Sequence, residues 1–385
     1  MITALAVENY RSLRRLVLAA GRLNVVTGPN GSGKSSLYRA LRLLADSARN
    51  GAVAALAREG GLESAMWAGS PDEGRSMRRG RGRPLVQGGA EHRLLLGFAG
   101  DEFGYAVDLG LPPPGTSMFG SDPEIKAESV WAGPVLRPAA VLAERGASGA
   151  VRIRTADGGW DRPPGFLKPF DSMLSQVADP QRAPELLVLR ERVRSWRFYD
   201  QLRTDAQAPA RTAQIGTRTP VLSHDGADLA AALQTIREIG DAQALDEAVG
   251  RAFPGSHVEV TVAAGRFELA LRQPGLLRPL RAAELSDGTL RYLLWAAALL
   301  TPRPPEMLVL NEPETSLHPE LIGPLAHLIA ASSKTQVIVV THAQPLVTAF
   351  GDGPARVLEL VKEDGRTLLA GQGILDEPAW HWPSR

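Results

Sequence analysis

The nine residues GPNGSGKSS, Gly28 to Ser36, constrain this chain more than any other stretch. They match the pattern G-x-x-x-x-G-K-[ST], and they lie between a Val-rich segment (22–27) that predicts a buried strand and an amphipathic segment (34–46) that predicts a helix. Glycines let the backbone turn its N–H groups toward phosphate oxygens, and the helix N-terminus adds partial positive charge. A Gly-rich turn without a ligand is the alternative. The complete pattern in this context favours a phosphate-binding loop.

Each residue type in this loop has a chemical use. Lys34 can reach the β- and γ-phosphates of a nucleoside triphosphate, and the hydroxyl of Ser35 can ligate Mg²⁺. We therefore expect ATP and Mg²⁺ to bind here. The predicted nucleotide-binding residues of the loop are Asn30, Gly31, Ser32, Gly33, Lys34, Ser35 and Ser36.

The composition limits the class of protein. The 385 residues suffice for one large domain or two lobes, and the apolar fraction of 44% is that of a globular protein. The chain has no Cys, which excludes disulfides and thiolate chemistry and fits a cytoplasmic location. Residues 1–13 lack a basic flank followed by a long apolar core, so we expect no signal peptide; the longest apolar run, 292–300, is too short to cross a bilayer, so we expect no membrane partner. The net charge of +1 excludes a uniformly basic nucleic-acid-binding protein, although the basic run 74–83 is either a solvated loop or a nucleic-acid contact.

Two apolar segments end in residues that suit phosphate chemistry. MLVLNEPE (307–314) predicts a strand that ends at Asn311 and Glu312. At the carboxyl end of such a strand, Glu312 can accept a proton from an attacking water. TQVIVVTHA (335–343) predicts a strand that ends at His342, which can donate to a γ-phosphate oxygen or hold that water. A surface Glu and a structural His are the alternatives.

The stretch LSDGTLR (285–291) precedes an apolar helix. Ser286 is a good N-cap, and Asp287 suits the positive end of the helix dipole. A Ser and a Gly at a helix N-terminus also form a second anion site. One nucleotide does not need two such sites from one subunit, whereas a two-fold dimer can offer each site to the γ-phosphate of its partner. The stretch therefore predicts a homodimer.

The rest of the chain predicts a mixture of helices and strands with no internal repeat. The expected elements are strands over 1–27, a loop over 50–90, two strands around the turn 99–104, further strands up to Trp160 that include AVRIRT, a mainly helical region over 171–203, a helix over 228–239, a hairpin over 257–272 and a last hairpin closed at Asp364 and Gly365.

With these motifs in this order, the chain resembles ABC-type ATPase heads of the SMC, RecF and OLD branch. It is most similar to the compact bacterial predicted ATPases of the AAA family. NYRSL (9–13), SHDGADLAAAL (223–233) and EPETSLHP (312–319) contribute to the resemblance, which covers most of the chain and is weakest over 48–90 and 111–170.

The resemblance implies an α/β P-loop NTPase fold in a single head over 1–385. Its parts would be a P-loop and β-rich lobe (1–170), a helical region with the signature motif (171–300), and a segment that completes the core (301–385). The roles implied are trans signature contacts for Ser286, Asp287, Gly288 and Arg291, an interface loop with Ser316 and His318, catalysis by Lys34, Glu312 and His342, metal sensing by Gln176, and nucleotide contact by Arg11.

The chain departs from the family pattern at two positions. Asn311 stands where Asp is usual, and Ala343 follows His342 where Ser is common. Asn keeps an oxygen that can accept a hydrogen bond from a metal-bound water, but it lacks the charge. We therefore expect Asn311 to serve the metal through water, with lower Mg²⁺ affinity.

The resemblance implies that the protein binds and hydrolyses ATP and closes into a homodimer around two nucleotides. It also implies a role in DNA maintenance, DNA repair or phage defence, with DNA as a partner. The alternative is a low-turnover ATP-dependent switch or scaffold that recruits a separate effector protein. A transporter motor is disfavoured by NYRSL and EPETSLHP. We expect no Toprim-type nuclease domain, because only 43 residues follow His342, and no SMC coiled coil, because the sequence has no long heptad repeat.

Overall fold

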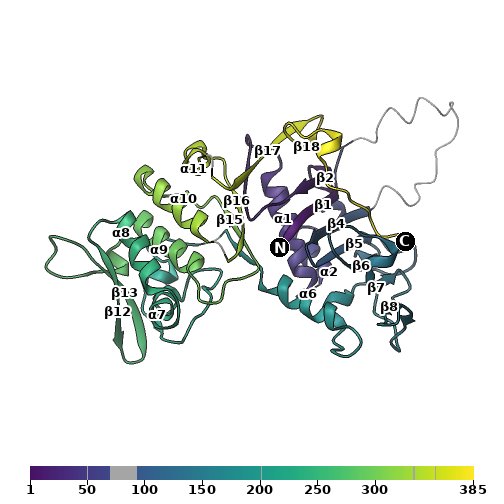
Figure 1. Ribbon diagram of the computed structural model, residues 1–385, viewed down its shortest axis with the longest axis horizontal. Coiled ribbons are helices and arrows are strands. Elements are labelled where there is room, and N and C mark those ends of the chain that lie inside the picture. Colours follow the sequence, from purple (N-terminus) through teal and green to yellow (C-terminus); the bar gives the residue numbers. More distant parts are fainter. Residues whose placement is uncertain (50, 70–92, 201, 333, 352) are drawn as a thin grey trace. The chain divides into compact units, whose positions relative to one another are not determined.

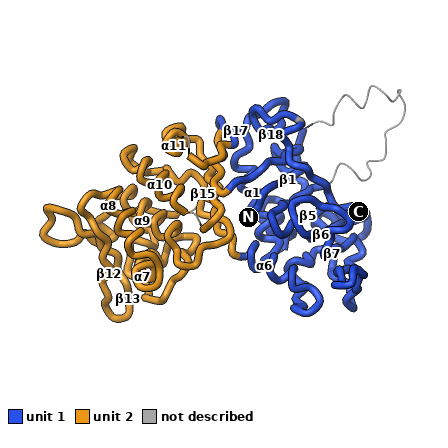
Figure 2. Tube along the Cα trace, in the orientation of Figure 1, with its two compact units in different colours: residues 1–21, 28–194, 358–385 blue, residues 22–27, 195–357 orange. Residues whose placement is uncertain are grey.

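The computed structural model describes residues 1–49, 51–69, 93–200, 202–332, 334–351 and 353–385, so the basic run 74–83 lies outside the described residues. The chain forms two compact units (Figure 2). Unit 1 comprises residues 1–21, 28–194 and 358–385, and unit 2 comprises residues 22–27 and 195–357. Among the described helices, none is long and apolar enough to cross a membrane.

Unit 1 contains an antiparallel sheet of eight strands in the order β2-β1-β4-β5-β6-β7-β8-β9 (Figure 1). The strands are β1 (Ile2–Tyr10), β2 (Leu13–Ala19), β4 (Arg93–Gly100), β5 (Phe103–Gly110), β6 (Glu124–Ala132), β7 (Val141–Gly146), β8 (Val151–Arg154) and β9 (Trp160–Asp161). They include the expected N-terminal strands, the expected pair around 99–104 and the strand in AVRIRT.

Helix α1 (Lys34–Ser47) packs against β1, β4 and the helix α2 (Ala52–Arg58). Leu37, Leu41 and Leu44, spaced for one helical face, are buried. The other helices that begin in this unit are α3 (Leu62–Ala65), α5 (Met173–Gln176) and α6 (Pro184–Ser195). The expected loop over 50–90 is therefore wrong for 52–65, where an Ala- and Leu-rich segment buries its apolar side chains in two short helices.

Unit 2 contains four parallel strands in the order β10-β15-β16-β3. They are β10 (Arg197–Tyr199), β15 (Met307–Asn311), β16 (Gln336–Val340) and β3 (Leu23–Thr27). β15 and β16 are almost continuously apolar and buried, as expected for parallel strands covered on both faces. β10 was not predicted, because its three residues follow directly on the α6 helix within the expected helical region.

The helices of unit 2 build its core around α9, whose residues 292–299 are all buried. Trp295 of α9 packs edge-on against Tyr199, with ring centroids 6.3 Å apart. The helices are α7 (Leu229–Ile239), α8 (Ala242–Ala252), α9 (Asp287–Leu299), α10 (Ile322–Ala331) and α11 (Gln344–Ala349).

The expected hairpin over 257–272 is present as β12 (His257–Ala263) and β13 (Arg266–Arg272), flanked by β11 (Gln214–Ile215) and β14 (Leu280–Arg281). The last hairpin consists of β17 (Ala355–Glu363) and β18 (Arg366–Leu369), and it turns at Asp364 and Gly365 as predicted. Short 3-10 turns are η1 (Pro138–Ala140), η2 (Pro209–Arg211), η3 (Ala282–Glu284), η4 (Pro319–Leu321) and η5 (Ile374–Asp376).

Candidate nucleotide-binding site

The loop between β3 and α1 adopts a conformation that requires glycine. Gly28, Gly31 and Gly33 have φ values of 139°, 78° and 108°. A Cβ atom at Gly28 would lie 2.2 Å from the carbonyl oxygen of Leu360, and one at Gly33 would lie 2.1 Å from Oγ1 of Thr367. Both distances are shorter than any real contact, so side chains are excluded at these two positions.

The loop presents groups that suit phosphate. Nζ of Lys34 donates to the carbonyl oxygens of Gly28 and Pro29, at 2.7 and 3.0 Å. The hydroxyl of Ser32 is buried, and within the described part of the chain it has no hydrogen-bond partner. Helix α1 begins after Gly33 without a side-chain cap, so its first N–H groups lack intrahelical acceptors. A charged amine, an unpaired hydroxyl and a helix N-terminus fit a nucleotide phosphate, and the exposed Ser35 fits Mg²⁺ beside it.

Residues distant in sequence hold this loop in place. Oγ1 of Thr367 on β18 lies 2.8 Å from the carbonyl oxygen of Ser32 and 2.8 Å from Oγ of Ser12. The Ser12 hydroxyl lies 3.2 Å from that of Ser36, and the N–H of Thr367 donates to the carbonyl oxygen of Ser12 at 2.9 Å. Thr367 and Ser12 were missed by sequence reasoning, because an isolated hydroxyl residue in a predicted hairpin or turn gives no signal.

Gly33→Ala should destabilise the protein and abolish nucleotide binding, because the new methyl group would displace Thr367. Gly31→Ala is the matched control. Gly31 also has a positive φ, but no atom of the described residues lies within 4 Å of the position that its Cβ would take. Backbone strain alone costs about 1–2 kcal/mol at either position. We expect the melting temperature and the affinity for a fluorescent ATP analogue to fall much further in Gly33→Ala, and equal effects would contradict this steric account.

In unit 2, the ends of β15 and β16 bring together two predicted catalytic residues. Nδ1 of His342 lies 3.1 Å from Oε1 of Glu312. Both side chains are partly exposed, at 52% and 43% respectively, so a water molecule can reach them. Glu312 has a φ of 47°, and its N–H donates to the carbonyl oxygen of Val340 at 2.7 Å. The main chain thus fixes Glu312 at the sheet edge where the sequence predicts it.

A second acidic residue joins the same two strand ends. Glu314 is buried, burial raises the pKa of its carboxyl, and the hydroxyl of Thr341 donates to its Oε1. The Thr341 oxygen also accepts the N–H of Ala343 at 2.9 Å. The contact between Thr341 and Glu314 therefore joins the segment that contains Glu312 to the segment that contains His342. Glu314 was missed, although a second Glu two residues after the first was the available signal.

The signature stretch forms the start of α9, as predicted. Oγ of Ser286 accepts the N–H of Thr289 at 3.1 Å and caps the helix. Asp287 accepts a hydrogen bond from the buried Arg211 at 2.6 Å, and Arg211 also donates to the carbonyl oxygen of Leu285 at 2.7 Å. Ser286 and Asp287 are exposed. Arg211 lies in a segment without any motif, so nothing in its local sequence distinguishes it from other arginines.

The signature helix and the predicted interface loop are packed together. A Cβ atom at Gly288 would lie 3.0 Å from the carbonyl oxygen of Ser316, and Nε1 of Trp295 donates to that of Pro313 at 2.8 Å. Nε of the half-buried Arg291 has no hydrogen-bond partner among the residues that the structure describes, and burial lowers the pKa of this guanidinium. His318 is exposed and caps η4. Helix α9 therefore lies in direct contact with the loop that follows Glu312.

Comparison with known families fits this geometry. Residues 23–105 and 168–349, more than half of the chain, match the family described as "AAA domain, putative AbiEii toxin, Type IV TA system". The chain belongs to this family. None of the curated proteins matches the sequence.

The fold of this AAA-family chain resembles that of an SMC ATPase head. An SMC head bound to the C-terminal winged-helix domain of ScpA is 15% identical, with a TM-score of 0.50 over 97% of this chain and 98% of that one. The SMC head of Thermotoga maritima is 15% identical, with a TM-score of 0.43 over 97% and 99%. An SMC head from Pyrococcus furiosus, bound to the C-terminal domain of ScpA, is 13% identical, with a TM-score of 0.48 over 96% and 95%.

Of the other predicted site residues in this AAA-family chain, Arg11 and Gln176 have local side-chain partners. The guanidinium of Arg11 pairs with Glu59, with Nη2 2.7 Å from Oε2. Gln176 ends α5, is exposed, and donates to the hydroxyl of Ser175 at 3.3 Å. Asn311 is half-buried at the end of β15. Nucleotide contact by Arg11 and metal sensing by Gln176 stay predictions. Among the described residues, no three His, Cys, Asp or Glu side chains gather as a metal site.

Proposed function

We propose that this protein binds and hydrolyses ATP and closes into a homodimer around two nucleotides, as a cytoplasmic ATPase of DNA maintenance or phage defence. One observation carries the proposal. The chain has a phosphate-binding loop that starts α1 and a second exposed, Ser-capped helix N-terminus at Ser286 on α9. The family match supports the same conclusion. We further propose that residues 1–385 form a single ATPase head that consists of the three consecutive parts 1–170, 171–300 and 301–385.

The proposed reaction assigns one task to each of these groups. Lys34 exchanges its carbonyl contacts for the β- and γ-phosphates. Glu312 accepts the proton of the attacking water, and His342, hydrogen-bonded to Glu312, orients that water or donates to the γ-phosphate. Bound Mg²⁺, held by Ser35 and through water by Asn311, would neutralise phosphate charge. The partner's signature residues complete the site, and hydrolysis removes the phosphate that links the two subunits.

A mixing experiment tests whether the signature acts in trans. Lys34→Ala removes the phosphate contact of one subunit, and Ser286→Arg blocks the exposed start of α9. We expect each variant alone to be inactive. An equimolar mixture should regain ATPase activity, because a heterodimer contains one site with both an intact loop and an intact signature. Mixing each variant with itself is the control, and a mixture that stays inactive while both variants remain folded would contradict the proposal.

Asn311→Asp should lower the Mg²⁺ concentration that gives half-maximal hydrolysis. A carboxylate accepts a charge-assisted hydrogen bond from a metal-bound water, worth on the order of 1 kcal/mol more than a neutral one, or about fivefold in affinity. The measurement is a Mg²⁺ titration of ATPase rate at neutral pH for both proteins. A midpoint that is unchanged, or higher because the new carboxylate disturbs Glu312, would show that Asn311 does not serve the metal.

A low-turnover switch that recruits an effector protein is the second candidate. The uncharged Asn311 favours it, because weaker metal binding slows turnover. DNA-stimulated hydrolysis would support the first function. Capture of a defined partner protein only with ATP, without any stimulation by DNA, would support the second.

A further inference from the structure

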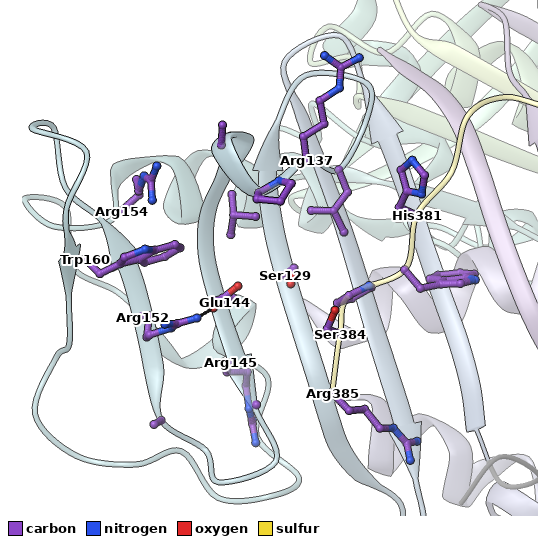
Figure 3. Close-up of a pocket in the computed structure, with 18 of the residues that line it drawn as sticks. Ser129, Arg137, Glu144, Arg145, Arg152, Arg154, Trp160, His381, Ser384 and Arg385 are labelled. Atoms are coloured by element: carbon purple, nitrogen blue, oxygen red, sulfur yellow. Dashed lines mark hydrogen bonds and ion pairs between the residues drawn. The ribbon is translucent and has the colours of Figure 1, made fainter.

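A broad groove lies on unit 1, far in sequence from the phosphate-binding loop (Figure 3). Its volume is about 1220 Å³, and it is lined by residues of β7, β8 and β9 and by the segment 381–385. The lining contains six arginines and one acidic residue, Glu144. The arginines are Arg137, Arg145, Arg152, Arg154, Arg162 and Arg385.

One wall of the groove is a stack of planar groups. The guanidinium carbons of Arg152 and Arg154 lie 4.9 and 5.0 Å from the ring centroid of Trp160. Figure 3 shows Arg154 above and Arg152 below this ring. Arg152 also pairs with Glu144 on the neighbouring strand β7. These contacts hold Trp160 and both guanidinium planes at the groove, although the three side chains are only half-buried.

The opposite wall is anchored to the sheet. Arg385 donates two hydrogen bonds to the buried carboxylate of Asp108, at 2.7 and 2.9 Å. Nε1 of Trp382 donates to Glu8 at 2.9 Å, and Trp382 packs edge-on against Trp380 with centroids 5.2 Å apart. The segment 381–385 is therefore a fixed wall of the groove.

The charges of the lining do not balance. Arg385 is paired with Asp108, Arg152 with Glu144, and Arg145 donates to main-chain carbonyl oxygens. Three cations remain. No carboxylate of the described residues pairs with Arg137, Arg154 or Arg162. Like charges around one concave surface raise its positive potential, which a polyanion would relieve.

We propose that this groove binds single-stranded nucleic acid. Its volume exceeds the 300–1,000 Å³ range of typical small-molecule sites, and its unpaired cations are spread over separate elements. Backbone phosphates suit Arg137, Arg154 and Arg162, while unpaired bases can stack on the outer guanidinium planes beside Trp160. A duplex could use the cations but not these stacking planes, because its bases are already paired and stacked. If the proposed function holds, single-stranded nucleic acid is what the ATPase acts on, whereas binding in the groove itself does not require ATP.

Fluorescence anisotropy with a labelled oligothymidine of about 15 nucleotides tests the proposal on the full-length protein. Substituting Arg137, Arg154 and Arg162 together with Gln should weaken binding at least tenfold. It should also lower the slope of log K against log salt by about 2, since each lost single-strand phosphate contact contributes about 0.7. The matched control replaces three exposed arginines of unit 2, Arg251, Arg303 and Arg356, with Gln, and should change affinity less than twofold.

Further arms separate other sources of binding. Lys34→Ala should bind the oligonucleotide like wild type, so failure of the ATPase proposal would not affect this result. Trp160→Leu should weaken binding without changing the salt slope. The proposal is overturned if wild type does not bind, if equal-length duplex or inorganic polyphosphate binds more tightly, or if both triple variants lose affinity equally. It is also overturned if replacing the arginines of the run 74–83 with Ala abolishes binding while the groove variant retains it.

Discussion

Glu312→Gln should reduce ATP hydrolysis by about 10²–10⁴-fold, the usual contribution of a general base, while ATP binding persists. The amide has the same shape as the carboxylate. It can still contact Nδ1 of His342, which lies 3.1 Å from Oε1 of Glu312 in the unsubstituted protein. It cannot accept the proton of the attacking water. ATP should therefore remain intact between two subunits. We expect sedimentation velocity to show a shift from monomer to dimer at saturating ATP in this variant.

Two controls make this result specific. Glu320→Gln changes a nearby carboxylate whose side chain is 88% exposed, and it should hydrolyse ATP like wild type. Adding Lys34→Ala to Glu312→Gln should prevent dimer formation, because Lys34→Ala removes the contact with the phosphates. If Glu312→Gln stays monomeric at saturating ATP, the trans role of Ser286 and Gly288 is wrong. If it still hydrolyses ATP at the wild-type rate, Glu312 is not the base.

The features that could be predicted from the sequence are local. The turn at Gly28 to Gly33 needs glycines at fixed positions, and the Ser286 cap needs only its own helix start. The contact between Glu312 and His342 joins two strands, but it follows from a general rule that parallel strands end at one sheet edge. These parts were predictable because short patterns determine them.

The parts that were missed depend on contacts across long stretches of chain. Thr367 supports the phosphate-binding loop from β18, 335 residues after Ser32. Arg211 reaches Asp287 across 76 residues. Neither side chain differs in its local sequence from a solvated Thr or Arg, so only the tertiary fold reveals its role. The short strand β10 was missed for the same reason, since three residues beside a helix give no period.

Arg211→Met should separate nucleotide binding from dimer formation. The side chain of Arg211 is only 8% exposed, and it donates to the carbonyl oxygens of Ala282 and Leu285 at 3.0 and 2.7 Å. Methionine would remove both contacts. The carbonyl oxygen of Ala282 would keep the N–H of Leu285 at 3.3 Å, whereas that of Leu285 would lose its hydrogen bond from Arg211, at a cost of about 1–3 kcal/mol for a buried group. The segment before Ser286 should then rearrange. We expect a lower melting temperature, loss of the ATP-dependent dimer, and unchanged binding of an ATP analogue to the monomer.

Two further substitutions, Arg203→Met and Asp287→Asn, identify which interaction of Arg211 supports dimer formation. Arg203 makes two hydrogen bonds to Asp205, both of 2.8 Å, but the two side chains are 54% and 52% exposed. Arg203→Met should therefore leave stability and dimer formation unchanged, because water replaces the lost partner. Asp287→Asn keeps the carbonyl contacts of Arg211 and removes only the charge of a side chain that is 58% exposed. A mild effect there, beside a large one for Arg211→Met, would assign the loss to the carbonyl contacts of Arg211. Equal losses in both would assign it to the ion pair, and an unchanged dimer in Arg211→Met would mean that Arg211 does not position the signature.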